Sequence, residues 1–170
     1  RLDITVASLK QCQDVANLAR QTNQQARIHL KVDTGMHRLG VSPDEAISIL
    51  DYITTEKSLK IVSVFSHLAM ASEREAVQYQ DKIFAQVVAK AQKDKSLIFH
   101  LASSEAARLF DNTHYDMVRI GLYQYGLAPD TVLPELKPAM SVKARINHIG
   151  TVPEGESAGY GWTWTARRDS

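Results

Sequence analysis

The sequence predicts an α/β fold, part of a (β/α)8 barrel of the TIM type, followed by the start of a mainly β second domain. Strand-like and helix-like segments alternate at intervals of roughly 30 residues, which is typical of βα units and a parallel sheet. Neither GxGxxG nor GxxxxGK[ST] occurs, and this favours the barrel over an open doubly wound sheet. After Pro129 the apolar pattern changes to period two, so we place a domain boundary near residue 130.

Length and charge narrow the class of protein. The chain has 170 residues, and its 20 Lys and Arg against 19 Asp and Glu give a net charge of +1 with histidine neutral. This balance argues against a nucleic-acid binder that works by releasing counterions. The hydrophobic fraction of 44% indicates a soluble, core-forming chain. No apolar run approaches the roughly 20 residues that span a bilayer, and one cysteine, Cys12, favours a reducing cytoplasm.

The first elements follow from the spacing of apolar residues. Apolar positions at helical spacing predict a helix over residues 9–19. Ser42 and Glu45 match a capping box, and Pro43 suits the first helical position, so a second helix is expected over 43–55. Continuous apolar runs predict strands at residues 2–6, 26–32 and 59–65.

The βα cycle then repeats. Ser72 and Glu75 match another capping box, and the apolar stripe after them predicts a third helix. Its expected buried residues are Tyr79, Ile83, Phe84, Val87, Val88 and Ala91. A short helix is expected at 104–110. Strands are expected at 96–101 and 117–123 and, beyond the boundary, at 140–148 in an antiparallel arrangement.

Polar residues stand where the predicted strands end. In a barrel the carboxyl ends of the strands form one rim, and the active site lies there. The candidates that share this position are Lys31, Asp33, Arg38, His67, Ser103, Ser104 and Arg119. Each residue alone also has a purely structural interpretation. The functional interpretation therefore depends on their meeting at one rim.

The first candidates each have an alternative. Lys31 and Asp33 point the same way along their strand and could form a structural ion pair. Arg38 could be a solvated loop cation, although Gly35 and Gly40 on either side indicate a shaped backbone. A histidine such as the one in FSHLA is more often a core residue than a functional one. These alternatives stay open from sequence alone.

The later candidates have alternatives as well. Ser103 and Ser104 read as an ordinary helix cap, or as hydroxyls beside helix amides that bind phosphate. Gly121 lets a ligand approach the backbone or simply packs closely. Arg119 would be a buried cation that needs a partner, for which a cofactor's ring nitrogen is suitable. His100 is interpreted as structural.

An aromatic segment near the end of the chain contains one further candidate. Tyr160 stands between Gly159 and Gly161, and two tryptophans follow. One interpretation is an exposed aromatic turn. The other is a phenol presented to a site across a domain or subunit gap, where nearby cations favour its ionised form.

Five segments in this order and spacing resemble the alanine racemases, which are fold-type III pyridoxal phosphate enzymes. The segments are KVDTGMHRLG, FSHLA, HLASSEAA, VRIGLYQYG and AGYGWTW. The resemblance covers essentially the whole chain. It implies a cofactor-binding α/β barrel domain over 1–130 and the beginning of a β domain over 131–170. It also implies pyridoxal 5'-phosphate as cofactor, L-alanine and D-alanine as substrates, and a homodimer.

The resemblance implies a role for each candidate. Tyr160 matches the catalytic tyrosine, which acts in the partner subunit's active site and exchanges a proton at the substrate's Cα. Arg38 matches the arginine that contacts the substrate carboxylate and the cofactor phenolate. Lys31 matches a lysine that is often carbamylated and then orients that arginine. The implied cofactor contacts are His67 against the pyridine ring, Arg119 at its nitrogen, and Ser103, Ser104, Gly121 and Leu122 around the phosphate.

One family feature is absent. The family attaches its cofactor to a lysine in a segment similar to KANAYGHG, which this sequence does not contain. We therefore expect the chain to be an internal part of a racemase that supplies D-alanine for peptidoglycan, and to be inactive in isolation. A broad-specificity amino-acid racemase of the same fold is an alternative. So is a non-catalytic pyridoxal phosphate-binding barrel, although residues 138–164 argue against it.

Overall fold

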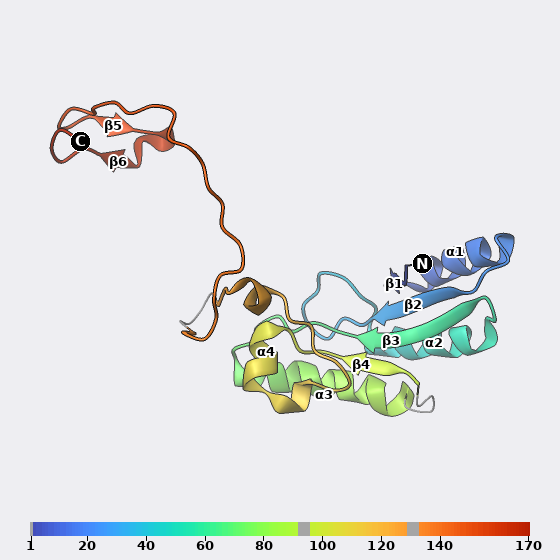
Figure 1. Cartoon of the computed structure of the whole chain (residues 1–170). Helices are drawn as coiled ribbons and strands as arrows, with labels where there is room; N and C mark the ends of the chain where they lie inside the picture. Colours follow the sequence, from blue (N-terminus) through green and yellow to red (C-terminus); the bar gives the residue numbers. More distant parts are fainter. Residues whose placement is uncertain (1, 92–95, 129–132) are drawn as a thin grey trace. The chain divides into compact units, whose positions relative to one another are not determined.

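A computed structural model describes residues 2–91, 96–128 and 133–170 (Figure 1). The chain divides into two compact units, Arg1–Ala139 and Met140–Ser170. We call them the α/β unit and the C-terminal unit. Residue 130, where the sequence places a domain boundary, lies outside the described residues.

The α/β unit is built on a four-stranded parallel sheet in the order β1-β2-β3-β4. Its strands are β1 (Ile4–Val6), β2 (Ala26–Lys31), β3 (Leu59–Phe65) and β4 (Ile98–His100). Right-handed connections between neighbouring parallel strands place all the connecting helices on one face of the sheet. These helices are α1 (Leu9–Gln21), α2 (Pro43–Thr55) and α3 (Arg74–Ala91) (Figure 1). The predicted alternation of strands and helices is confirmed.

Local sequence signals account for where two helices begin. The Ser8 hydroxyl accepts a hydrogen bond from the Gln11 amide at the start of α1. At α2 the capping box of Ser42 and Glu45 is complete, with Pro43 in the first turn. Each interaction satisfies a helix amide that has no partner within the helix. The predicted bounds of α2 are therefore those observed.

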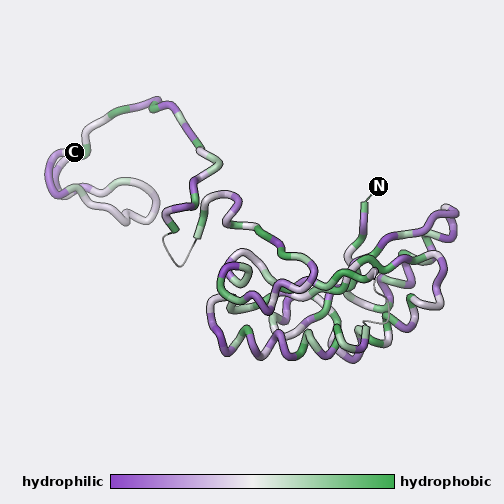
Figure 2. The backbone as a smooth tube through the Cα atoms, turned by 60° about the horizontal axis from the view of Figure 1, so that its bottom comes forward, coloured by the Kyte–Doolittle hydropathy of each residue, from purple (hydrophilic) through white to green (hydrophobic). Residues whose placement is uncertain are grey.

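The face of the sheet beneath the helices holds the core. Strand residues on this face are buried, and hydrophobic stretches run along the strands (Figure 2). The helices contribute the matching apolar side chains. Buried members of this core include Ile28, Leu30, Val64, Phe84, Phe99 and Leu101.

The predicted buried stripe of α3 is observed in part: Phe84, Val87 and Val88 are buried, whereas Ile83 and Ala91 are only partly buried. Tyr79 was expected to be buried, but it is 65% exposed. The buried positions of α3 are Val77, Gln80, Phe84, Val87 and Val88. Gln80 is polar, so the apolar pattern did not mark it as a buried position. Its burial is possible because its side-chain amide forms hydrogen bonds with two loops.

The opposite face of the sheet is polar. Neighbouring residues of a strand point to opposite faces, and the register aligns His29 with Ser63 and Phe65 with His100. Lys31 is aligned with Phe65 on the same face. A row of titratable and hydroxyl side chains therefore crosses the strands on the side away from the helices.

The predicted strand at 117–123 is wrong. This segment forms one parallel bridge, between Ser103 and Arg119, and then the 3-10 turn η2 (Leu122–Tyr125). The chain turns away from the sheet at Gly121, where φ is −107° and ψ is −87°. Before it lie α4 (Ser104–Leu109) and the turn η1 (Asp111–Thr113).

The C-terminal unit also differs from expectation. Residues 140–148 form no strand, and no backbone hydrogen bond joins them to another described segment. Alternation alone does not make a strand, because the backbone groups need a partner. The antiparallel pair is instead β5 (Ser157–Ala158) with β6 (Trp164–Thr165), joined through η3 (Tyr160–Trp162). Within the described ranges, no helix is long and apolar enough to cross a membrane.

Candidate functional site

The carboxyl ends of β2, β3 and β4 bring several candidates together around one aromatic ring. Nζ of Lys31 lies 5.5 Å from the centroid of the Phe65 ring, and Cζ of Arg119 lies 5.4 Å from it. The imidazole of His100 stacks on the same ring, with centroids 4.9 Å apart. The ring face attracts cations, so Phe65 offsets part of the repulsion between these two positive side chains. We call Lys31, Phe65, His67, His100 and Arg119 the rim cluster.

Arg119 is the best-anchored member of the rim cluster. Its Nη1 donates to Nδ1 of His100 at 2.6 Å. Its Nη2 donates to the carbonyl oxygens of Ser66 at 2.7 Å and Leu101 at 3.1 Å, and lies 3.2 Å from Nδ1 of His67. Ser66 directly follows β3, while His100 ends β4 and Leu101 follows it, so the guanidinium joins the ends of two strands. Its Nε–H donates to no described residue.

Lys31 is buried, and its ammonium donates to the carbonyl oxygen of Val32 at 2.9 Å. Burial lowers the pKa of Lys31 to about 8; Asp33 opposes this shift, and Arg119 and Arg38 add to it. Within the described part of the chain, a structural ion pair between Lys31 and Asp33 is not formed, and the ion-pair partner of Asp33 is His37. The neutral amine form of Lys31 is therefore much more abundant near pH 7 than it would be at the ordinary pKa of 10.5.

The carboxylate of Asp33 binds the backbone of the loop that follows β2. Its Oδ1 accepts hydrogen bonds from the amides of Gly35, Met36 and His37. These bonds lower the pKa of the carboxyl, although burial opposes them. The carboxylate therefore shapes the loop that carries Arg38, while its charge partly opposes the lowering of the Lys31 pKa.

Arg38 is exposed in that loop. Its charge lowers the pKa of both Lys31 and His67, which places it within electrostatic reach of the rim cluster. The loop returns to the sheet at Gly40, where φ is +126° and an added Cβ would lie 2.7 Å from the Asp33 nitrogen. Only glycine fits this close approach without strain.

His67 lies at the rim, half-buried. Burial lowers its pKa, and the charges of Arg119, Arg38 and Lys31 lower it further, so the imidazole is neutral at pH 7. A buried amide fixes the loop around it. The side chain of Gln80 donates to the His67 carbonyl at 3.1 Å and to Thr34 Oγ1 at 3.1 Å, and accepts from the Ala69 amide at 2.8 Å.

Gln80 thus joins the loop after β2 to the loop after β3. The sequence did not single out this residue, nor Ser63 and His29, which form hydrogen bonds leading to His100. His100 itself was interpreted as structural, but it contacts Arg119 directly. The sequence signal that could have identified these residues is that each is a polar residue within an otherwise apolar strand or helix pattern.

Ser103, Ser104, Gly121 and Leu122 lie where α4 begins and the chain turns. Ser103 precedes α4, but its side chain caps no helix amide, so the ordinary capping interpretation does not hold. The hydroxyl of Ser104 accepts a hydrogen bond from the Gly121 amide at 2.9 Å. An added Cβ on Gly121 would meet no described atom within 4 Å. The space beside this glycine is open.

Tyr160 belongs to the C-terminal unit, and its side chain is fully exposed there. Gly159 and Gly161 on either side have positive φ angles of 79° and 71°. These left-handed conformations hold the phenol at the tip of the turn between β5 and β6. The exposed aromatic turn is therefore the local structure of this segment.

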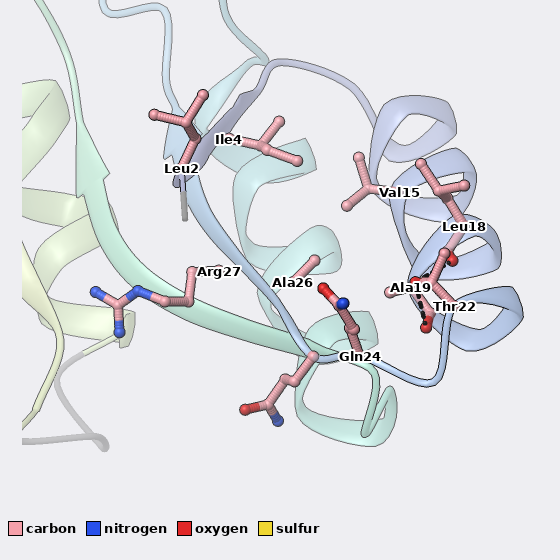
Figure 3. A pocket seen from close by; sticks show the side chains of 10 residues that line it. Leu2, Ile4, Val15, Leu18, Ala19, Thr22, Gln24, Ala26 and Arg27 are labelled. Atoms are coloured by element: carbon pink, nitrogen blue, oxygen red, sulfur yellow. Dashed lines mark hydrogen bonds between the residues drawn. The ribbon is translucent and has the colours of Figure 1, made fainter.

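A groove at the outer edge of β1 lies apart from these residues. It is lined by β1, by α1, by the connection from α1 to β2 and by the first residues of β2, including Ile4, Val15, Leu18 and Arg27 (Figure 3). None of its lining residues belongs to the rim cluster. The chemistry of the α/β unit therefore lies at the strand ends rather than in this groove.

The burial of Lys31 gives a pH-dependent prediction. Its folded-state pKa of about 8 lies below the ordinary 10.5, so between these pH values the folded chain binds fewer protons than the unfolded chain. The stability cost of the ammonium is thus fully present below pH 8 and is relieved as the pH rises to 10.5. Relative to wild type, Lys31→Met should be more stable by about 2 kcal/mol at pH 7, and this difference should shrink by pH 10.

Urea unfolding at both pH values measures this difference. Lys60→Met, at an exposed position of β3, is the matched control and should show little pH-dependent difference. A pH-independent gain in Lys31→Met would contradict the assigned cost of burying the charge.

Taken together, the rim cluster and the neighbouring Arg38 provide three cationic side chains, Lys31, Arg38 and Arg119, beside the Phe65 ring and the two imidazoles of His67 and His100. The nearest carboxylate, Asp33, is already bound by loop amides. Such a site is suited to an anionic, aromatic ligand, because cations bind anionic groups and the rings offer stacking surfaces.

Comparisons with known proteins identify the family. The family model described as "Alanine racemase, N-terminal domain" matches residues 1–129. The alanine racemase of Desulforamulus reducens is 33% identical to this chain over an alignment of 177 positions. The alignment covers 98% of this chain and 48% of that protein. The chain therefore spans about half the length of this curated relative.

Solved structures give the same result. The biosynthetic alanine racemase of Pseudomonas aeruginosa superposes with a TM-score of 0.80 at 32% identity, covering 99% of this chain and 47% of that one. The alanine racemase of Bartonella henselae, solved with covalently bound pyridoxal phosphate, gives a TM-score of 0.77 at 25% identity over 99% of this chain and 47% of that one. The parallel βα sheet matches the corresponding part of the barrel in these enzymes. By its matched residues and its fold, this chain belongs to the alanine racemase N-terminal domain family.

Proposed function

We propose that this chain is part of a pyridoxal phosphate-dependent alanine racemase, which interconverts L- and D-alanine for peptidoglycan. The reaction removes the Cα proton from one face of the amino acid and returns a proton to the other. The observation that carries the proposal is the anchored Arg119 beside Lys31, Phe65 and His67 at the strand ends. Family membership supports the same conclusion.

The residues present fit the cofactor. Arg119 has an Nε–H that donates to no described residue, and an open space adjoins Gly121. Ser104 accepts from the Gly121 amide, so its own hydroxyl hydrogen is available for a phosphate oxygen. A direct phosphate contact from the Gly121 amide would require that amide to share its bond to Ser104. Ser103 and Leu122 complete the proposed phosphate contacts, and His67 would lie against the pyridine ring.

Arg119 has a specific role in this proposal. When bound, pyridoxal phosphate withdraws electrons from the substrate's Cα and makes its proton acidic. A guanidinium keeps its own proton, so Arg119 leaves the ring nitrogen unprotonated and limits that electron withdrawal. The side chain thereby disfavours side reactions while it positions the ring.

Arg38 and Lys31 would act at the substrate side. Arg38, exposed and close to the rim, binds the substrate carboxylate and the cofactor phenolate. Lys31 would carry a carbamate, formed when its neutral amine attacks carbon dioxide and releases one proton, and the negative charge of this group would orient Arg38. Carbamylation requires the neutral amine, and the pKa of about 8 caused mainly by burial makes that form accessible near neutral pH.

Tyr160 would supply the proton-transfer group that the α/β unit lacks. Its exposure at the tip of a glycine-flanked turn is what a residue needs to reach the partner subunit's site in a homodimer. We further infer that residues 1–130 are part of the cofactor-binding barrel and that 131–170 begin the β domain. The 170-residue chain alone, without the cofactor-binding lysine, should be inactive.

The experiment is racemisation of L-alanine by the full-length protein that contains this chain, followed by circular dichroism. Conversion to D-alanine, dependent on added pyridoxal phosphate, is the expected result. Serine and other small amino acids, tested alongside, reveal a broad-specificity racemase. Cofactor binding without exchange of any Cα proton would contradict the proposal and indicate a non-catalytic cofactor-binding barrel.

A second prediction concerns the open space at Gly121. Gly121→Ala should fold normally, because the added Cβ meets no described atom within 4 Å. It should nevertheless lower the affinity for pyridoxal phosphate by about tenfold, since the methyl group occupies space that the phosphate needs. Titration of the cofactor followed by its absorbance measures this affinity.

Gly40→Ala provides the contrast. It places a Cβ 2.7 Å from the Asp33 nitrogen at a φ of +126°, and should lower the urea midpoint. Unchanged cofactor affinity in a folded Gly121→Ala protein would remove this glycine from the phosphate site.

A further inference from the structure

A chain of hydrogen bonds crosses the polar face of the sheet and ends at Arg119. Going outward from the guanidinium, its members are His100 at the end of β4, Ser63 in β3, His29 in β2 and Asp3 just before β1. The distances between their polar atoms are 2.6, 3.0, 2.6 and 3.3 Å in that order. No step of the proposed reaction uses these four residues.

The directions of the first two bonds in this chain follow from Arg119. A guanidinium has no acceptor, so Nδ1 of His100 must accept and carries no proton. Burial, with the charges of Arg119 and His29, lowers the pKa of His100 to about 4, and its imidazole is therefore neutral at pH 7. Its single ring proton stands on Nε2 and is donated to Ser63 Oγ.

The chain continues beyond this serine. Ser63 Oγ accepts from Nε2 of His100 and lies 2.6 Å from Nδ1 of His29. Nε2 of His29 donates to Oδ2 of Asp3, because a carboxylate only accepts. Asp3 accepts from Arg27 through its other oxygen at 2.8 Å, which keeps the carboxylate ionised. The chain thus links a cation, Arg119, to a carboxylate, Asp3.

We propose that His100 is a positioning residue for Arg119, and that Ser63, His29 and Asp3 form a relay that holds His100 in its Nε2–H tautomer. If His100 took the other tautomer, two N–H groups would face each other and Arg119 would lose one anchor. The role of Arg119 toward a cofactor rests on the proposed function. The relay itself rests only on the contacts above.

Protein NMR of the full-length holoprotein, labelled with ¹⁵N in histidine and arginine, tests this inference. At neutral pH, His100 should show an unprotonated Nδ1 and a protonated Nε2. Ser63→Ala interrupts the relay and should speed solvent exchange of the Arg119 guanidinium protons by about tenfold. Asp3→Asn, at the solvent-accessible end, keeps an acceptor but removes the charge and should speed it by about two- to threefold.

Ser48→Ala is the matched control, since its hydroxyl contacts only a backbone carbonyl on α2. It should leave Arg119 exchange unchanged. A proton on Nδ1 of His100 would overturn the proposal, as would exchange unaffected by both Asp3→Asn and a folded Ser63→Ala. An equal increase in Ser48→Ala would overturn it too, because the effect would then be global.

Racemase activity is measured separately on the same samples. If the protein showed the stated His100 tautomer and the expected changes in Arg119 exchange but no racemase activity, the proposed function would be wrong and the relay would be supported. If the protein were an active racemase with the opposite His100 tautomer, the relay would be wrong and the proposed function would be supported.

Discussion

Tyr160→Phe in the full-length protein should lower racemisation by about a thousandfold, which is within the range for loss of a general acid or base. The phenol is proposed to exchange a proton at one face of the substrate's Cα, and phenylalanine has the same shape without the proton. The loss should therefore be one-sided. In deuterated water, one enantiomer of alanine should stop exchanging its Cα proton, while the other continues to exchange.

The absorbance of the bound cofactor should stay unchanged in this variant, because Tyr160 is not among the proposed cofactor contacts. Tyr79→Phe is the matched control, since Tyr79 is an exposed tyrosine of α3 outside the rim cluster. It should retain full activity. Wild-type racemisation by Tyr160→Phe would remove this residue from the mechanism.

Gln80→Leu should destabilise the protein by about 2–4 kcal/mol. Gln80 is only 3% exposed, and its amide bonds to the Ala69 amide, to Thr34 and to the His67 carbonyl. Leucine has a similar volume but leaves these buried groups without a partner. Because Gln80 joins the loops that carry Arg38 and His67, kcat should fall along with stability.

Urea unfolding and steady-state kinetics measure the two effects. Gln78→Leu makes the same replacement on the exposed side of α3 and should change stability by less than about 0.5 kcal/mol. If Gln80→Leu behaved like Gln78→Leu, the buried amide would have no part in holding the two loops.

The βα order of the fold is predictable from sequence because its signals are local. Ser42, Pro43 and Glu45 specify the start of α2 through side chains that bond to their own helix. The bounds of β3 agree with its apolar run for a similar reason: a buried parallel strand is hydrophobic along its length.

Two errors share a physical cause. Residues 140–148 alternate as a strand does, yet their backbone pairs with no other described segment. Residues 117–123 are apolar enough for a strand, but the side chain of Arg119 bonds to the neighbouring strand ends and the backbone turns at Gly121. A segment forms a strand only where its backbone groups pair with a neighbouring strand. The residue pattern within one segment does not show whether such a neighbour is present.

By itself, the sequence determined the alternation of helices and strands and the residues that stand at the strand ends, because periodicity and capping act within a few positions. Only the tertiary structure decided which polar side chains touch. Phe65 between Lys31 and Arg119, the amide of Gln80 and the bonds from Arg119 to Asp3 join residues that are distant in sequence. Such contacts depend on strand register, which places His29 beside Ser63 and Phe65 beside His100.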